Sequence, residues 1–216
     1  MTQQAAIETQ PGRRLSPERR RHEIIQGTIK ALAAHGPQKC SLRQVARDMG
    51  IAPSLLTYFF NSWAELLLET YRWLADMTEK DYVELAARLG PDPKQNLQDY
   101  LDLYFSDKWT ADDVAGAYIS FWALSRGEVD LKTEMLAFSE KDRARARPLL
   151  EAYLTSRGIT ENIDALNEAF CVMLSGIWYE NAVNPLAMTR ELGMKSAWTF
   201  LNAIAPAGIR DDKPAD

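Results

Sequence analysis

Cysteine and histidine are scarce in this sequence, and their scarcity excludes several kinds of site. Cys40 and Cys171 are the only cysteines among 216 residues and stand far apart, so we expect two small core residues and no disulfide framework. The only histidines, His22 and His35, fall on one predicted helix. Glycine-rich phosphate loops, zinc-ligand clusters and nucleophile elbows are also missing, so we expect no catalytic residue, no metal and no cofactor.

Long apolar runs and alternating patterns are lacking as well. No stretch approaches the roughly 18 consecutive apolar residues of a membrane span, and no apolar signal segment follows the Arg-rich N-terminus. We therefore expect a cytoplasmic protein without a membrane partner. Apolar residues recur at spacings of three and four, and 46% of the chain is hydrophobic, which predicts an all-α fold with a proper core.

Capping and breaking signals predict about nine helices. They are expected from Pro17 to the Gly36-Pro37 break, from Ser41 to Met49, from Pro53 to about Phe59, from Trp63 to about Leu89, and over 94–106, 112–126, 130–157, 161–183 and 188–205. The domains predicted are a disordered tail (1–14), a helix-turn-helix DNA-binding domain (15–61), a ligand-binding and dimerisation domain (62–206) and a frayed tail (207–216).

Charge is distributed unevenly along the chain. Residues 13–50 hold nine Lys or Arg against three acids, a net of +6, whereas the whole chain carries −5. A basic end on an acidic protein is typical of a segment that meets phosphates while the remaining protein avoids nucleic acid.

The segment SLRQVARDMGIAPSLLTYFF, residues 41–60, has the spacing of two short helices that cross near a right angle. Ala46 is the small residue at the crossing and Gly50 gives the turn its backbone freedom. A miniature core is expected from Val45, Met49, Ile51, Leu56 and Phe59. This motif, lying behind a basic helix, predicts binding to double-stranded DNA.

The candidate DNA-binding residues divide into two groups. On the first helix of the motif, the N-terminus at Ser41 is expected to meet a phosphate, with charge from Arg43 and Arg47 and with Gln44 as the capping-box partner of Ser41. On the second helix, the outward side is expected to read bases in the major groove, and it carries Pro53, Ser54, Thr57 and Tyr58.

Three stretches in this order resemble the TetR family of transcriptional repressors: RRRHEIIQGTIKALAAHG, SLRQVARDMGIAPSLLTYFF and NSWAELLLE, across residues 19–69. The resemblance implies a three-helix DNA-binding head, a helical ligand-binding body, and homodimers formed by the last two long helices. Thr57 and Trp63 depart from the pattern, because many members have Tyr and Lys at these places.

The body is most similar to the BetI-type branch, in SFWALSRGEVDL (120–131) and FCVMLSGIWYENAVNP (170–185). That branch represses choline-to-betaine genes and is relieved by choline, although Ser175 stands where its members often have Asp. Aromatic rings attract cations. We therefore take as candidates for contacting a small organic cation, such as a choline-like amine, Tyr104, Phe121, Trp122, Trp178 and Asn181, while core packing remains the alternative for these aromatics.

Apolar stripes on the last two helices predict a four-helix interface between two subunits. Its candidate residues are Leu166, Phe170, Met173, Leu174, Ile177, Leu192, Trp198, Leu201 and Ile204. The sequence thus predicts a dimeric repressor that binds a near-palindromic operator and is released by a small molecule. The alternatives are a helical adaptor that binds only protein, and a small enzyme.

Overall fold

The computed structural model describes residues 16–206, and every regular element among them is a helix. The prediction of an all-α fold is confirmed. The helices are α1 (Pro17–His35), α2 (Leu42–Asp48), α3 (Pro53–Phe59), α4 (Trp63–Ala86), α5 (Pro93–Tyr104), α6 (Asp107–Thr110), α7 (Asp112–Leu124), α8 (Val129–Ser156), α9 (Ile163–Val183) and α10 (Arg190–Ile204). Both predicted tails, 1–14 and 207–216, lie outside the described residues.

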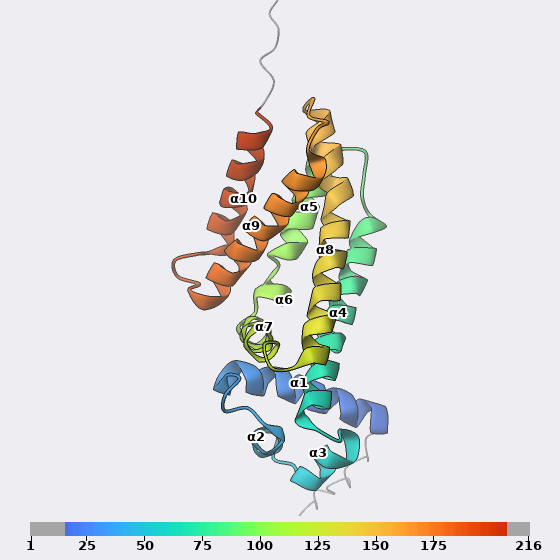
Figure 1. Ribbon diagram of the computed structural model, residues 1–216, viewed down its shortest axis with the longest axis vertical. Coiled ribbons are helices and arrows are strands. Elements are labelled where there is room, and N and C mark those ends of the chain that lie inside the picture. The colour runs from blue at the N-terminus through green and yellow to red at the C-terminus, as the bar shows by residue number, and fades with distance from the viewer. Residues whose placement is uncertain (1–15, 207–216) are drawn as a thin grey trace, which may run out of the picture.

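Helices α1 to α3 form a small unit at one end of the molecule, drawn at the bottom of Figure 1. The Ser16 side chain caps α1 and the Ser41 side chain caps α2. Gly36 and Gly50 end α1 and α2 with φ of 70° and 64°, a region that favours glycine because it has no Cβ. Val45, Ala46 and Leu56 are buried where α2 and α3 meet, as the crossing requires.

The head is packed firmly on the body through α1, which runs across the base of α7 (Figure 1). The Ser120 hydroxyl of α7 donates a hydrogen bond of 3.1 Å to the carbonyl of Leu32. Gly116 lies so close to α1 that an added Cβ would come within 2.8 Å of Ala33. One hydrophobic core therefore continues from α1 and α2 into α4, α7 and the start of α8.

The body is built around two long helices, α4 and α8, which pack against each other. Helix α8 also contacts α5 and α9, and α10 packs on α9 (Figure 1). A second core fills the space between these helices, and Tyr100, Tyr153 and Phe170 are among its largest fully buried residues. Cys40 and Cys171 are both buried and unpaired, as the sequence predicts.

Most helix limits lie within two residues of the prediction, and two differences are larger. The long helix after α3 ends at Ala86 rather than near Leu89, and the segment before α7 contains the four-residue α6, where Trp109 is buried. None of the helices among the described residues is long and apolar enough to cross a membrane.

Candidate functional site

The outer side of α3 is fully available to a partner. Pro53, Ser54, Thr57 and Tyr58 are all exposed, and the Tyr58 side chain protrudes with an exposed fraction of 78%. On the opposite side of the same helix Leu56 is fully buried. Thr57 donates a hydrogen bond to the carbonyl of Ser54, so its hydroxyl is already engaged within the helix.

The polar residues of α2 are less free than the sequence suggests. Ser41 accepts a hydrogen bond from the backbone N–H of Gln44, as a cap does. The Gln44 side chain does not return to Ser41; its amide donates to Asp48 at 2.7 Å, and its oxygen accepts a hydrogen bond from Arg47 at 3.1 Å. Gln44 is therefore engaged within α2 and, by a contact of 3.2 Å with the His35 ring, at the end of α1. Arg43 and Arg47 remain exposed on the surface.

One basic residue of the N-terminal stretch faces inward and joins three helices. Arg21 of α1 donates a hydrogen bond of 2.6 Å to the carbonyl of Phe59, the last residue of α3. Its guanidinium also pairs with Glu69 of α4 and lies 4.3 Å from the ring centre of Phe60. Arg21 thus ties the end of α3 to α4 and does not contribute a free charge to the surface.

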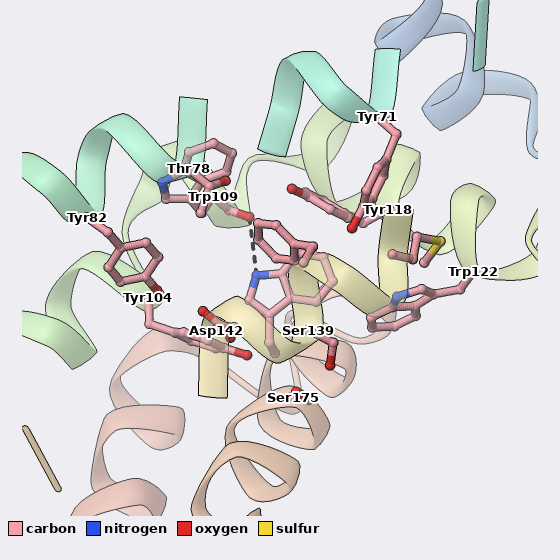
Figure 2. A pocket seen from close by; sticks show the side chains of 13 residues that line it. Tyr71, Thr78, Tyr82, Tyr104, Trp109, Tyr118, Trp122, Ser139, Asp142 and Ser175 are labelled. Atoms are coloured by element: carbon pink, nitrogen blue, oxygen red, sulfur yellow. Dashed lines mark hydrogen bonds between the residues drawn. The ribbon is translucent and has the colours of Figure 1, made fainter. Parts of the chain in front are cut away.

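A cavity of about 170 Å³ lies in the body, between α4 and α8, and is shown in Figure 2. Six helices supply its walls, and most of its lining side chains are aromatic. The lining consists of Tyr71, Thr78, Tyr82, Tyr104, Trp109, Tyr118, Trp122, Met135, Phe138, Ser139, Asp142, Ser175 and Trp178.

Two of the three indoles in this wall use their polar atoms within the protein. Trp178 donates a hydrogen bond of 3.3 Å to the carbonyl of Trp109, drawn as a dashed line in Figure 2, and Trp109 donates to Asp81 at 2.9 Å. Trp122 is 37% exposed and stacks on Tyr179. Burial raises the pKa of the Tyr104 and Tyr118 hydroxyls, which keeps both phenols neutral.

One carboxylate, that of Asp142, lies in this aromatic wall. Burial raises the pKa of Asp142 from its ordinary value to about 6, although Arg145 and Arg143 act in the opposite direction. In Figure 2 Asp142 and Ser139 of α8 lie across the space from Tyr71 and Thr78 of α4. The cavity is therefore a mainly apolar cage with one acidic group.

The sequence candidates for the ligand site are only partly brought together. Tyr104, Trp122 and Trp178 line the cavity. Phe121 does not: it is fully buried behind the wall, edge-on to Tyr71 at 5.4 Å between ring centres. Asn181 lies elsewhere too, because its amide donates a hydrogen bond to the carbonyl of Met188 and so fixes the loop before α10.

Sequence reasoning missed the contributions of α4 and α8, although a signal was present. Met135, Phe138, Ser139 and Asp142 follow each other at helical spacings of three, one and three, so that an acid falls on the apolar face of α8. An acidic residue in such a stripe is the sequence mark of a buried charge.

The predicted dimer residues require a correction. Phe170, Leu174, Ile177 and Leu201 are buried within the subunit's own core, and Leu166, Met173, Trp198 and Ile204 are half-buried against it. Only Leu192 is exposed. Both sides of α9 carry apolar residues, and the sequence pattern does not say which side faces the subunit's own core. The side left in solvent, here called the outer α9 stripe, consists of Ala165, Ala169, Val172, Gly176, Tyr179 and Val183.

Within residues 16–206 no group of three or more His, Cys, Asp or Glu side chains is arranged to hold a metal ion. No family model matches the chain. Among curated proteins it is similar to the HTH-type transcriptional regulator BetI of Agrobacterium fabrum, with 24% identity over 179 residues that cover 82% of each chain.

Solved structures share the fold. A TetR transcription regulator from Haloarcula marismortui superposes with a TM-score of 0.74 at 15% identity, covering 86% of this chain and 98% of its own. A transcriptional regulator from Saccharomonospora viridis in complex with choline superposes with a TM-score of 0.76 at 13% identity, covering 86% and 96%. All three are named as transcriptional regulators, and the similarity runs through head and body alike. The chain is thus similar in sequence to BetI-type regulators and shares its fold with TetR-family regulators.

Proposed function

We propose that this regulator is a repressor that binds a near-palindromic operator as a homodimer and is released when a small organic cation enters the cavity. One observation carries the proposal: α4 connects the two sites. Only residues 60–62 separate it from α3, and further along it supplies Tyr71, Thr78 and Tyr82 to the cavity wall. A ligand that favours one position of α4 must therefore act on the helix next to the DNA-reading face.

The head (15–61) meets DNA through α3. Ser54, Thr57 and Tyr58 approach base edges in the major groove, because they are exposed on the side away from Leu56. Arg43 and Arg47 contact phosphates, which orients the head without reading sequence. Pro53 begins the helix, and Ser41 and Gln44 support these residues from α2.

The link between α3 and α4 is stiffened by Arg21. Its hydrogen bond to the end of α3 and its ion pair with Glu69 of α4 make the two helices move together. Effector and operator favour different positions of α4. Each ligand shifts the equilibrium between the two positions only by the difference in its affinity for them, so the two ligands oppose each other. The coupling is reciprocal: an effector that weakens operator binding is itself bound more weakly in the presence of operator.

The body (62–206) selects the effector. Faces of Trp and Tyr attract cations, with about 0.5–2 kcal/mol for a well-placed contact. The volume of about 170 Å³ is close to that of cavities of about 150 Å³ that hold benzene, so the effector is a small molecule. Tyr104, Trp122 and Trp178 contact it, and the choline held by the Saccharomonospora viridis regulator supports this ligand class.

The dimer forms through α9 and α10. The outer α9 stripe repeats at alternating spacings of four and three residues, as in helices that pack lengthwise on a partner helix. Leu192 is exposed on α10, which packs on α9, and we assign it to the same interface. In such a dimer two α3 helices lie about one DNA turn apart, roughly 34 Å, and read a near-palindrome.

The experiment uses purified full-length chain to select duplexes from a random pool, followed by affinity measurements with and without choline. We expect one near-palindromic sequence to be enriched, bound with a steep salt dependence, and released by the cation. The proposal is contradicted if no sequence is enriched. It is also contradicted if the affinity for the operator is the same in the presence and absence of each cation that binds the protein.

A further inference from the structure

The Asp142 carboxylate lacks a good partner within its own subunit. Its side chain is only 19% exposed, and the nearest cationic atom is Nη1 of Arg145, 3.6 Å from Oδ1. That distance is within the range of an ion pair but longer than a good hydrogen bond. A carboxylate withdrawn from water is costly unless it is paired and hydrogen-bonded, so this group is only partly compensated.

Arg145 is held away from Asp142 by other contacts. Its Nη2 pairs with Glu79 of α4, and its guanidinium carbon lies 4.9 Å from the ring centre of Tyr82 and 5.6 Å from that of Phe138. Within the described part of the chain, Nη1 is buried without a hydrogen-bond partner. Arg145 is thus shared among several partners, and no cationic side chain meets Asp142 from the cavity side among the described residues.

The rest of the cavity wall suits a positive charge and little else. Aromatic rings present negative faces, and the polar atoms of Trp109 and Trp178 are already bonded within the protein. No cationic side chain lines the cavity among the described residues. An anion placed there would meet the carboxylate and the ring faces without a counter-charge.

We infer that Asp142 determines the charge of the effector: the cavity takes a small organic monocation, whose cationic centre lies against this carboxylate and within the aromatic rings. This inference rests on the proposed function, since it assigns the cavity as the effector site. Neutral molecules of the same size bind weakly, because they add no counter-charge to a buried carboxylate that is only partly compensated.

The titratable groups around Asp142 come from every helix packed against it. They are Arg143 and Arg145 of α8, Tyr71 and Tyr82 of α4, Tyr100 and Tyr104 of α5, Tyr118 of α7 and Cys171 of α9. Burial raises the pKa of the five phenols well above neutrality and that of the Cys171 thiol to about 12. Between pH 5 and 8 Asp142 is thus the group in this set that changes charge.

The test compares choline, whose charge is permanent, with 3,3-dimethyl-1-butanol, in which carbon replaces the ammonium nitrogen. Calorimetry on the full chain at pH 8 is expected to give at least tenfold tighter binding of choline than of the neutral isostere. Asp142→Asn, which keeps the side-chain size, should weaken choline binding and reduce that preference to the part that the aromatic rings supply. For the unchanged protein, choline affinity should fall as pH drops below 6, approaching tenfold per pH unit, and the Asn variant should show no such dependence.

Glu140→Gln is the matched control, because it removes one negative charge from the exposed side of α8. It should leave choline binding and its pH dependence unchanged. Equal binding of choline and its isostere, no binding of choline at all, or unchanged choline affinity in Asp142→Asn would overturn the inference. Duplex binding by the same preparations separates the two proposals: charge selection without any DNA binding refutes the repressor and leaves the role of Asp142 intact.

Discussion

Replacing Asp142 by Asn should make the ligand-free protein more stable at neutral pH. The folded-state pKa of this carboxyl is about 6, above its ordinary value of 3.8. Between these two pH values the folded protein holds a proton that the unfolded chain has released. The free energy of unfolding therefore falls as pH rises from about 4 to about 6, and remains lower above. The Asn side chain does not ionise, so the free energy of unfolding of the variant does not fall in this way.

The magnitude follows from the pKa difference. A shift of about 2 units corresponds to about 3 kcal/mol, at 1.36 kcal/mol per unit. This figure already includes the opposing effect of Arg145 and Arg143. For a chain of this length about 1 kcal/mol raises Tm by roughly 2–4 °C, so we expect an increase of at least about 6 °C at pH 7.5.

The assay is thermal unfolding of both proteins at one protein concentration, from pH 4 to pH 8. The difference in Tm should be nearly absent at pH 4, grow through pH 5 to 6 and level off above pH 7. Glu140→Gln serves as the control and should show no such growth. A variant that is less stable at pH 7.5, or a difference independent of pH, would refute the reasoning, since either result means that Asp142 is well compensated in the fold.

Four further outcomes are expected. Tyr58→Ala should weaken operator binding by about 1–3 kcal/mol without changing Tm, because the side chain is 78% exposed; unchanged affinity in a gel-shift titration would remove Tyr58 from the DNA contact. Arg21→Met should lower the free energy of unfolding by about 2–3 kcal/mol in denaturant titrations, because it leaves the Phe59 carbonyl and Glu69 without their donor. Arg19→Met, at an exposed position, should change it by no more than about 0.5 kcal/mol, and equal effects of the two substitutions would argue against the role of Arg21. Val172→Asp on the outer α9 stripe should give a monomer in light scattering, while Val83→Asp, at a similarly exposed position of α4, should leave the dimer intact; two dimeric variants would place the interface elsewhere. Trp122→Ala should abolish release of operator by choline and preserve operator affinity in its absence; a normal response would take Trp122 out of the effector site.

The sequence carried enough information for the fold class and the head because their signals are local. Helix caps such as Ser41, breaks such as Gly36 and Gly50, and apolar residues at spacings of three and four act within a few positions. The outward side of α3 follows from the same periodicity once Leu56 is placed inside. For this reason Ser54, Thr57 and Tyr58 are exposed where the pattern predicts.

The sequence predicts the packing of the body less well, since apolar residues cover more than one side of its helices. On α9 both Phe170 and Val172 are apolar, yet one lies in the subunit's own core and the other in solvent. On α7 Phe121 packs behind the cavity wall and Trp122 lines it, although the two are adjacent. Neighbouring helices determine these outcomes, and a helix's own sequence does not identify those neighbours.

The sequence by itself thus determined an all-helical chain with a basic helix-turn-helix head, because hydrogen bonds within helices and their caps depend on nearby residues. Only the tertiary structure decided that Arg21 turns inward to Phe59 and Glu69, and that Asp142 faces a cavity whose aromatic rings come largely from other helices. These arrangements join residues many positions apart, and they form only when α1, α4 and α8 come together. Whether a charge is exposed, paired or left open to a ligand is a property of that packing and not of the local sequence.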